Sequence, residues 1–320
     1  MTVRPGTERV DTDRDRSATR IPLALVGPTA TGKTEASLVL AERLGAEIML
    51  IDSMTVYRGM DVGTAKPSAV DRRRVPHHLA DVADPAAPFS VAAFQRLAAG
   101  AREQILDRGN RPFLVGGSGL YFRAVVDGLE FPGTDARLRR SLEAEAAALG
   151  PGPLHERLAA FDPAAAAKME PSNARRVVRA LEVAALTGRA FSEYAEPWDR
   201  YPEGRVRAAG VTVAADVLRT RIEARARDQL DGALLDEVRR LLASGLDRTA
   251  RQAIGYAEAI DHLQGRLALD EAVERIVRRT RTLARRQLAW FRRDPRIRWF
   301  EADERGASGL IDELEEHYRG

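Results

Sequence analysis

The decisive stretch of this chain is Gly27-Pro28-Thr29-Ala30-Thr31-Gly32-Lys33-Thr34, which fits the phosphate-binding pattern Gly-x4-Gly-Lys-Ser/Thr. An apolar run from Pro22 to Gly27 predicts a buried strand before it, and helical spacing follows from Glu35 to Leu44. A loop between a strand and a helix offers free backbone N–H groups and the positive end of the helix dipole to an anion. We call residues 27–34 the phosphate loop and expect it to bind a di- or triphosphate.

Two side chains of the phosphate loop extend this prediction. Lys33 supplies a positive charge for the outer phosphates, and the Thr34 hydroxyl is expected to hold Mg2+. A phosphate loop alone is compatible with kinases, nucleotide hydrolases and transferases that release diphosphate. The residues around it must therefore distinguish these classes.

The composition is that of a globular protein, since 44% of the 320 residues are hydrophobic, enough for one large domain or two modest ones. The absence of cysteine excludes disulfides, thiolate metal sites and a cysteine nucleophile. Arginine is concentrated in residues 271–298, where the acidic side chains are those of Glu271, Glu274 and Asp294. Such a basic segment indicates either a polyanionic partner or a solvated helix face.

Residues 1–20 are polar and charged and lack the apolar centre of a signal peptide. We expect them to form a disordered tail on a cytoplasmic protein. No stretch of the sequence reaches the length of a membrane span, so no membrane partner is predicted.

Strands and helices alternate through the first part of the chain. A second strand is predicted over residues 47–51, ending at Asp52-Ser53, and a third over residues 111–115, ending at Gly116-Gly117-Ser118-Gly119. A helix capped by Ser90 separates them. This alternation predicts an α/β fold, a P-loop NTPase-like parallel sheet flanked by helices. The phosphate loop, Asp52-Ser53 and Gly117-Ser118 all follow strands and should meet at one edge of that sheet.

The pattern changes between residues 129 and 202, which predict helices over 135–149, 163–169 and 172–186 and no strand. We therefore expect an all-helical insert at 129–202 within a core made of residues 21–128 and 203–320. The second part of the core returns to strand character over 206–213. It continues with a long basic helix over 269–292, a strand over 297–300 and a closing helix over 309–318.

Asp52 is the main candidate for chemistry beside the phosphate loop. A lone carboxylate at this place is compatible with a magnesium ligand, a general base or a buried structural acid. The residue pattern by itself leaves these three roles open.

Several motifs together resemble the tRNA dimethylallyltransferases, also called tRNA isopentenyltransferases. Besides the phosphate loop they are Ile51-Asp-Ser53, Tyr57-Arg-Gly-Met-Asp-Val-Gly-Thr-Ala-Lys66, Val75-Pro-His-His-Leu79, Leu114-Val-Gly-Gly-Ser-Gly-Leu-Tyr-Phe122 and Gln252-Ala-Ile-Gly-Tyr256. The resemblance runs from about residue 21 to residue 300 in the same order. It departs from the family at Gln252, where some members carry Arg, and at Gly117-Ser118-Gly119, where Gly-Gly-Thr is more usual.

The resemblance implies transfer of a dimethylallyl group from its diphosphate to N6 of adenine-37, next to the tRNA anticodon, with release of diphosphate. The phosphate loop would bind the diphosphate together with Mg2+. Asp52 would accept the proton of the adenine amine, and Ser118 would contact the reacting groups. These implied roles agree with an amine that is a poor nucleophile and a leaving group that gains negative charge.

The resemblance also implies contacts with the anticodon stem-loop of tRNA, and we expect the protein to be a monomer. The residues that match tRNA-contacting positions of the family are Asp52, Ser53, Met54, Thr55, Arg139, Arg175, Arg176, Val177, Val178, Arg179, Thr282, Leu283, Ala284, Arg285, Arg286 and Gln287.

Three other functions remain as alternatives. A small-molecule P-loop kinase would use Asp52 as a base toward a hydroxyl group, and an adenylate isopentenyltransferase would act on a free nucleotide. Neither needs so many basic residues outside the phosphate site. A nonenzymatic nucleic-acid-binding module would explain the arginines but not the phosphate loop. Transfer of a prenyl group to an anticodon stem-loop separates all of these from the main interpretation.

Overall fold

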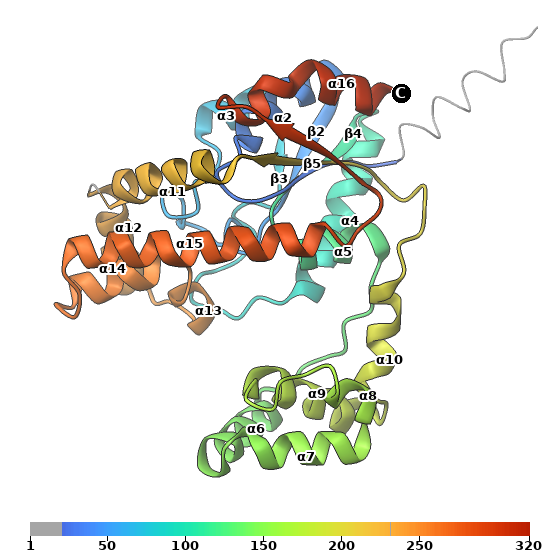
Figure 1. Ribbon diagram of the computed structural model, residues 1–320, viewed down its shortest axis with the longest axis vertical. Coiled ribbons are helices and arrows are strands. Elements are labelled where there is room, and N and C mark those ends of the chain that lie inside the picture. Colours follow the sequence, from blue (N-terminus) through green and yellow to red (C-terminus); the bar gives the residue numbers. More distant parts are fainter. Residues whose placement is uncertain (1–20, 231) are drawn as a thin grey trace, which may run out of the picture. The chain divides into compact units, whose positions relative to one another are not determined.

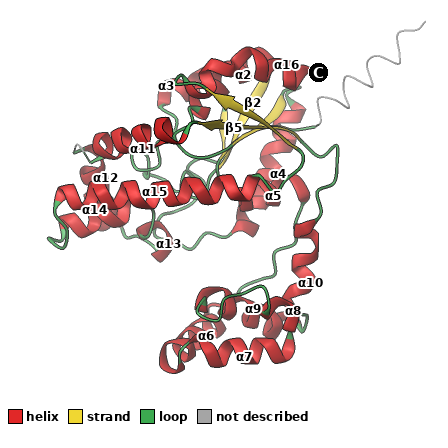
Figure 2. Cartoon of the chain, viewed as in Figure 1, coloured by secondary structure: helices red, strands yellow, loops and turns green. Residues whose placement is uncertain are grey.

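The computed structural model describes residues 21–230 and 232–320, so the tail expected at residues 1–20 lies outside the described residues. Six parallel strands form one sheet in the order β3-β2-β4-β1-β5-β6. The strands of this sheet are yellow in Figure 2. Their bounds are β1 Leu23–Val26, β2 Ala46–Ile51, β3 His77–His78, β4 Arg111–Gly116, β5 Arg207–Val213 and β6 Ile297–Ala302. The predicted α/β fold with a parallel sheet is confirmed.

Helices cover both faces of this sheet (Figure 1). One face packs on α2 (Lys33–Leu44) and α16 (Ile311–Arg319). The other face packs on a larger group, which includes α4 (Val91–Asp107), α5 (Gly119–Asp127), α11 (Ala215–Gln229), α12 (Ala233–Ser244), α14 (Tyr256–Leu263) and α15 (Leu269–Phe291). Strand β1 shows why two layers form, because Leu23 and Leu25 lie in the first core and Ala24 and Val26 in the second.

Local signals set the ends of the helices near the sheet. The Ser90 hydroxyl accepts a hydrogen bond from the backbone N–H of Ala93 and begins α4. Gly45, in the left-handed conformation, ends α2. The remaining elements of the core are α3 (Ala69–Arg74), α13 (Arg248–Arg251) and the 3-10 helix η2 (Gly306–Leu310). Among the described residues, no helix combines the length and the apolar character needed to cross a membrane.

The chain folds as two compact units, and the smaller one is Gly128–Tyr201. It contains α6 (Ala136–Leu149), α7 (Pro151–Phe161), α8 (Pro163–Ala166), α9 (Ala174–Thr187), α10 (Phe191–Ala195) and the 3-10 helix η1 (Glu196–Asp199). This unit has its own core, to which Leu142, Leu158 and Val177 belong. We refer to it as the insert.

Two details of the insert differ from the sequence prediction. Helix α7 was not predicted, because its opening Pro151-Gly-Pro is typical of a break, although proline is well tolerated in the first turn of a helix. The helix predicted over 163–169 ends at Ala166, since the following residues form turns.

Candidate active site

The three predicted loops lie together because their strands are neighbours. Strand β4 pairs with both β1 and β2, and Gly116 stands opposite both Val26 and Ile51. Each of these residues is at the carboxyl end of its strand. The backbone N–H of Ser118 donates to the Ile51 carbonyl over 3.2 Å, which ties the third loop to the second. The phosphate loop, Asp52 and Ser118 therefore share one edge of the sheet.

The phosphate loop needs its glycines. Gly27 has a φ of 142°, and a Cβ built on it would lie 3.3 Å from the Val211 nitrogen and closer still to the Val211 carbonyl oxygen. Gly32 has a φ of 82° and begins α2. Ala30 also has a positive φ, 65°, which is unfavourable for a residue with a Cβ. Such backbone strain is typical of a loop whose N–H groups are fixed for a ligand.

Lys33 folds back over the phosphate loop. Its ammonium donates to the Pro28 carbonyl and to the Thr31 hydroxyl, the latter over 3.3 Å. The pKa of Lys33 is lowered to about 7, mainly by burial and also by the nearby Arg225, and Asp52 opposes both effects. An anion that binds here would stabilise the charged form of Lys33.

Two arginines of α11 reach the phosphate loop, and sequence reasoning missed both. Arg225 donates to the Thr29 hydroxyl over 3.4 Å, and Arg221 donates to the Ala30 carbonyl over 3.2 Å. Burial lowers the pKa of Arg225, and the Asp52 carboxylate opposes this shift. Their spacing of four residues puts both arginines on one face of α11, which directly follows β5. This spacing is a sequence signal that could have marked them as candidates for an anion site.

Asp52 has one bound and one available carboxylate oxygen. Oδ1 accepts the backbone N–H groups of Met54, over 2.7 Å, and Thr55, over 3.2 Å. Within residues 21–230 and 232–320, Oδ2 receives no hydrogen bond, and the same holds for the Ser118 hydroxyl. Asp52 and Ser118 are both half-buried. The carboxylate is thus oriented by its own turn while one oxygen can accept a proton.

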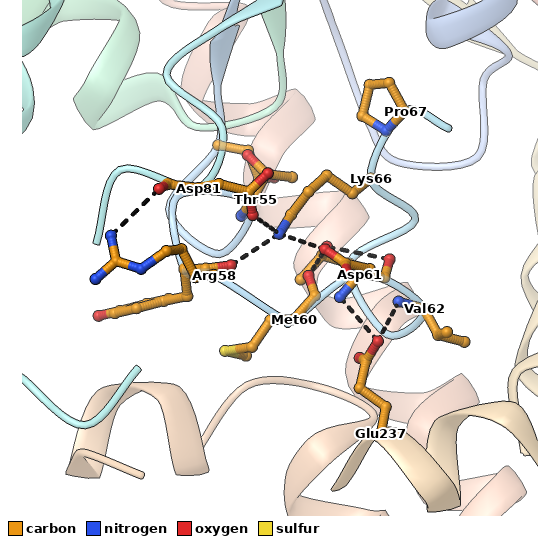
Figure 3. Close-up of polar contacts among 12 residues, drawn as sticks. Thr55, Arg58, Met60, Asp61, Val62, Lys66, Pro67, Asp81 and Glu237 are labelled. Atoms are coloured by element: carbon orange, nitrogen blue, oxygen red, sulfur yellow. Dashed lines mark hydrogen bonds and ion pairs between the residues drawn. The ribbon is translucent and has the colours of Figure 1, made fainter. Parts of the chain in front are cut away.

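A buried ammonium fixes the segment that follows Asp52. Lys66, whose side chain is 1% exposed, donates to the Tyr57 carbonyl over 2.8 Å and to the carboxylates of Asp61 and Asp81 over 2.6 and 2.7 Å (Figure 3). Glu237 of α12 accepts the backbone N–H of Asp61 over 3.0 Å. These ion pairs and hydrogen bonds hold the segment after β2 in a defined conformation.

The tRNA-contact prediction for this segment needs one correction. Ser53 and Met54 are half-buried, but the Thr55 side chain is only 6% exposed. The Thr55 hydroxyl has no hydrogen-bond partner in the described part of the chain. The Thr55 side chain is therefore buried in the turn and presents no surface to RNA in this structure.

Helix α15 has two different faces where RNA contact was predicted. Arg281, Thr282, Arg285 and Arg286 are exposed, whereas Leu283 is half-buried and Ala284 is 2% exposed in the core. The predicted contact does not extend to the Ala284 side chain, because helical periodicity turns that side chain into the protein interior. Gln287 lies on the inner face, and its Oε1 accepts the Thr29 backbone N–H over 2.9 Å.

The insert places its predicted residues in two groups. Arg175 and Arg176 are exposed, whereas Val177 and Val178 are 0% and 3% exposed and belong to the core, so their side chains are not RNA contacts.

Arg139 and Arg179 form the second group of the insert. Both bind the Glu182 carboxylate, which is fully buried, over 2.5 and 2.7 Å. Burial opposes ionisation of Glu182, but hydrogen bonds from the two arginines hold its pKa below the ordinary value. Arg139 and Arg179 therefore stabilise the insert in this structure, with 38% and 26% of their side chains exposed.

The residues at the phosphate loop suit a magnesium ion that arrives with its ligand. The described residues contain no group of three or more His, Asp or Glu side chains able to hold a metal by themselves. Thr34 is exposed at the start of α2, and its hydroxyl is the kind of hard oxygen that Mg2+ binds. Mg2+ prefers this arrangement, in which the protein supplies one or two oxygens and phosphates and waters supply the others.

Comparisons with known proteins show the family of this chain. The sequence profile of the IPP transferase family matches residues 55–294, and that of the isopentenyl transferases matches residues 21–75. Two proteins described as tRNA dimethylallyltransferases are each 50% identical over 296 residues. The one from Nocardioides sp. matches over 92% of this chain and 94% of its own, and the one from Streptomyces coelicolor over 92% of both.

A solved structure extends the likeness to three dimensions. The full-length tRNA isopentenylpyrophosphate transferase from Bacillus halodurans is 41% identical, with a TM-score of 0.68 over 94% of this chain and 96% of that chain. Since the IPP transferase profile and these relatives each match most of the chain, the chain belongs to the IPP transferase family, that of the tRNA dimethylallyltransferases, and is a prenyltransferase.

Proposed function

We propose that this protein transfers a dimethylallyl group from dimethylallyl diphosphate to N6 of adenine-37 of tRNA, releasing diphosphate. One observation supports this above all. The free oxygen of Asp52 stands at the same sheet edge as the phosphate loop, and Asp52 interacts electrostatically with both Lys33 and Arg225. A proton acceptor and an anion site so close together suit a reaction that deprotonates an amine and expels a diphosphate.

The donor would bind through its diphosphate. The N–H groups at the start of α2, Lys33 and Arg225 would compensate the negative charge that grows on the leaving oxygen as the C–O bond breaks. Bound Mg2+ would supply further neutralisation of that charge, with Thr34 as its ligand. The Ser118 hydroxyl has no other partner in the part of the chain that the structure describes, and it would donate a hydrogen bond to a diphosphate oxygen.

The acceptor would react at the exocyclic amine of the base. That lone pair is delocalised into the ring, so transfer of the amine proton to Asp52 Oδ2 would assist attack on the allylic carbon. One N–C bond forms, one C–O bond breaks, diphosphate leaves and Asp52 takes the proton. Oδ1 remains on the N–H groups of Met54 and Thr55, which keep the carboxylate oriented.

The RNA would be held by exposed arginines. Arg281, Arg285 and Arg286 of α15 have no ion pair among residues 21–230 and 232–320, unlike Arg278, which pairs with Glu274 over 3.3 Å. Arg175 and Arg176 are exposed on the insert. Unpaired exposed arginines suit phosphate contacts along an anticodon stem-loop.

A transfer assay tests this function directly. The purified chain is incubated with labelled dimethylallyl diphosphate and Mg2+, with an anticodon stem-loop, an otherwise identical stem-loop lacking adenine-37, or AMP. We expect label on the first RNA alone. Label on AMP would favour the adenylate isopentenyltransferase alternative, and no label on any acceptor would refute the proposal.

A further inference from the structure

Gln287 touches two parts of the donor site although it belongs to a helix proposed to bind RNA. Its Oε1 accepts the Thr29 backbone N–H over 2.9 Å, across 258 positions of sequence. The amide nitrogen then points toward Gly117. A Cβ built on Gly117 would lie 3.0 Å from Gln287 Cδ, closer still to Nε2, and 3.3 Å from the Gly27 carbonyl oxygen.

The glycines after β4 leave room for this approach. A Cβ on Gly119 would lie closer than 3.0 Å to the ring of Trp290, which is three residues after Gln287 on α15. Gln287 and Trp290 therefore occupy the space that side chains at 117 and 119 would fill. Neither Gly117 nor Gly119 has a positive φ, so close packing, rather than backbone conformation, is what these two positions require.

The opposite side of the same helix is open to solvent. Arg285 and Arg286 are exposed, whereas Gln287 is half-buried. The side-chain amide of Gln287 has one acceptor and two donors, and the acceptor is used on the phosphate loop. This contact holds the backbone of the phosphate loop at Thr29, and the neutral amide offers no positive charge to a nucleic acid.

We infer that Gln287 is a positioning residue of the donor site: its amide holds the phosphate loop through Thr29 and lies against Gly117. The inference rests on the proposed function, and it reassigns a residue that the family resemblance places among the RNA contacts. Diphosphate affinity then depends on a helix whose other face binds RNA. Loss of one neutral hydrogen bond should weaken diphosphate binding about 3- to 10-fold.

The test measures affinity for inorganic pyrophosphate with Mg2+ by calorimetry, and affinity for the anticodon stem-loop at several salt concentrations. Gln287→Ala should weaken pyrophosphate binding by that factor and leave RNA affinity and its salt slope unchanged. Arg286→Ala is the matched control on the outer face. It should weaken RNA binding and reduce its salt slope, and it should leave pyrophosphate affinity unchanged. A Gln287→Ala protein that binds pyrophosphate within twofold of wild type would refute the inference, as would a loss of RNA affinity alone.

A double-mutant cycle makes the test specific to the contact. Gly117→Ala should displace the Gln287 amide and weaken pyrophosphate binding in the same direction. In the double variant the shorter side chain at 287 leaves room for the new methyl group. The double variant should therefore lose about as much pyrophosphate affinity as Gln287→Ala alone. Losses that multiply would show that the two residues act independently, against the inference. A wild-type protein that binds pyrophosphate but transfers no prenyl group would instead refute the proposed function.

Discussion

Binding of a diphosphate should draw a proton onto Lys33. The pKa of Lys33 is lowered from 10.5 to about 7, first by burial and then by Arg225. A diphosphate beside the ammonium favours the charged form and raises this pKa again. With a pKa of about 7, about 0.9 of the Lys33 side chains are neutral at pH 8 and about 0.1 at pH 6.

The expected proton uptake by Lys33 is therefore about 0.9 per bound pyrophosphate at pH 8 and about 0.1 at pH 6. The affinity should fall as the pH rises above about 7, because each binding event must then supply the missing proton. Calorimetry in buffers of different ionisation enthalpy measures the number of protons taken up.

The Lys33→Arg variant is the control for this experiment, because a guanidinium stays protonated throughout this range. Protons exchanged by the pyrophosphate itself occur in both proteins, so the difference between them reports Lys33. Equal proton numbers at pH 8 in the two proteins would refute the account of Lys33 as an amine that is largely neutral at this pH in the free site.

Four further substitutions test other parts of the protein. Thr34→Ala should abolish transfer and weaken the dependence on Mg2+, and near-wild-type steady-state kinetics would exclude Thr34 as a metal ligand. Arg285→Ala and Arg286→Ala should each reduce the slope of log affinity for tRNA against log salt by about 0.7 to 0.9, and an unchanged slope in both would move the RNA surface elsewhere. Glu182→Gln removes the charge that Arg139 and Arg179 share and should destabilise the insert by about 1–3 kcal/mol. Thermal unfolding of this variant at the wild-type temperature would contradict that role.

Local patterns were sufficient to predict every strand of the parallel sheet except β3, and to place the three loops at one edge of it. The phosphate loop could be predicted because its spacing is short and its backbone conformation demands glycine at fixed places. Asp52 and Ser118 could be predicted because the carboxyl ends of neighbouring parallel strands share an edge. Helix α4 could be predicted from Ser90, which caps it.

The contacts that join distant segments could not be predicted in the same way. Arg225 and Gln287 reach the phosphate loop from helices that begin far along the chain. Residue spacing shows which side chains share a helix face, as for Arg221 and Arg225, but it does not state which loop that face meets. A partial signal existed for Gln287, because Ala284 and Phe291 are buried and lie three residues before and four residues after it on α15. The family resemblance implied RNA contact for the whole segment 282–287, whereas packing buries Ala284 and turns Gln287 toward the phosphate loop.

The central claim is that Asp52 accepts a proton from the amine while the phosphate loop holds the leaving group. Asp52→Asn keeps the size of the side chain and an oxygen for the turn at Met54, but removes the basic oxygen. Single-turnover transfer to a saturating anticodon stem-loop measures the chemical step. The account predicts unchanged folding and RNA affinity with a rate lower by about 100-fold or more. A rate loss below about tenfold would contradict it and reduce Asp52 to a positioning residue.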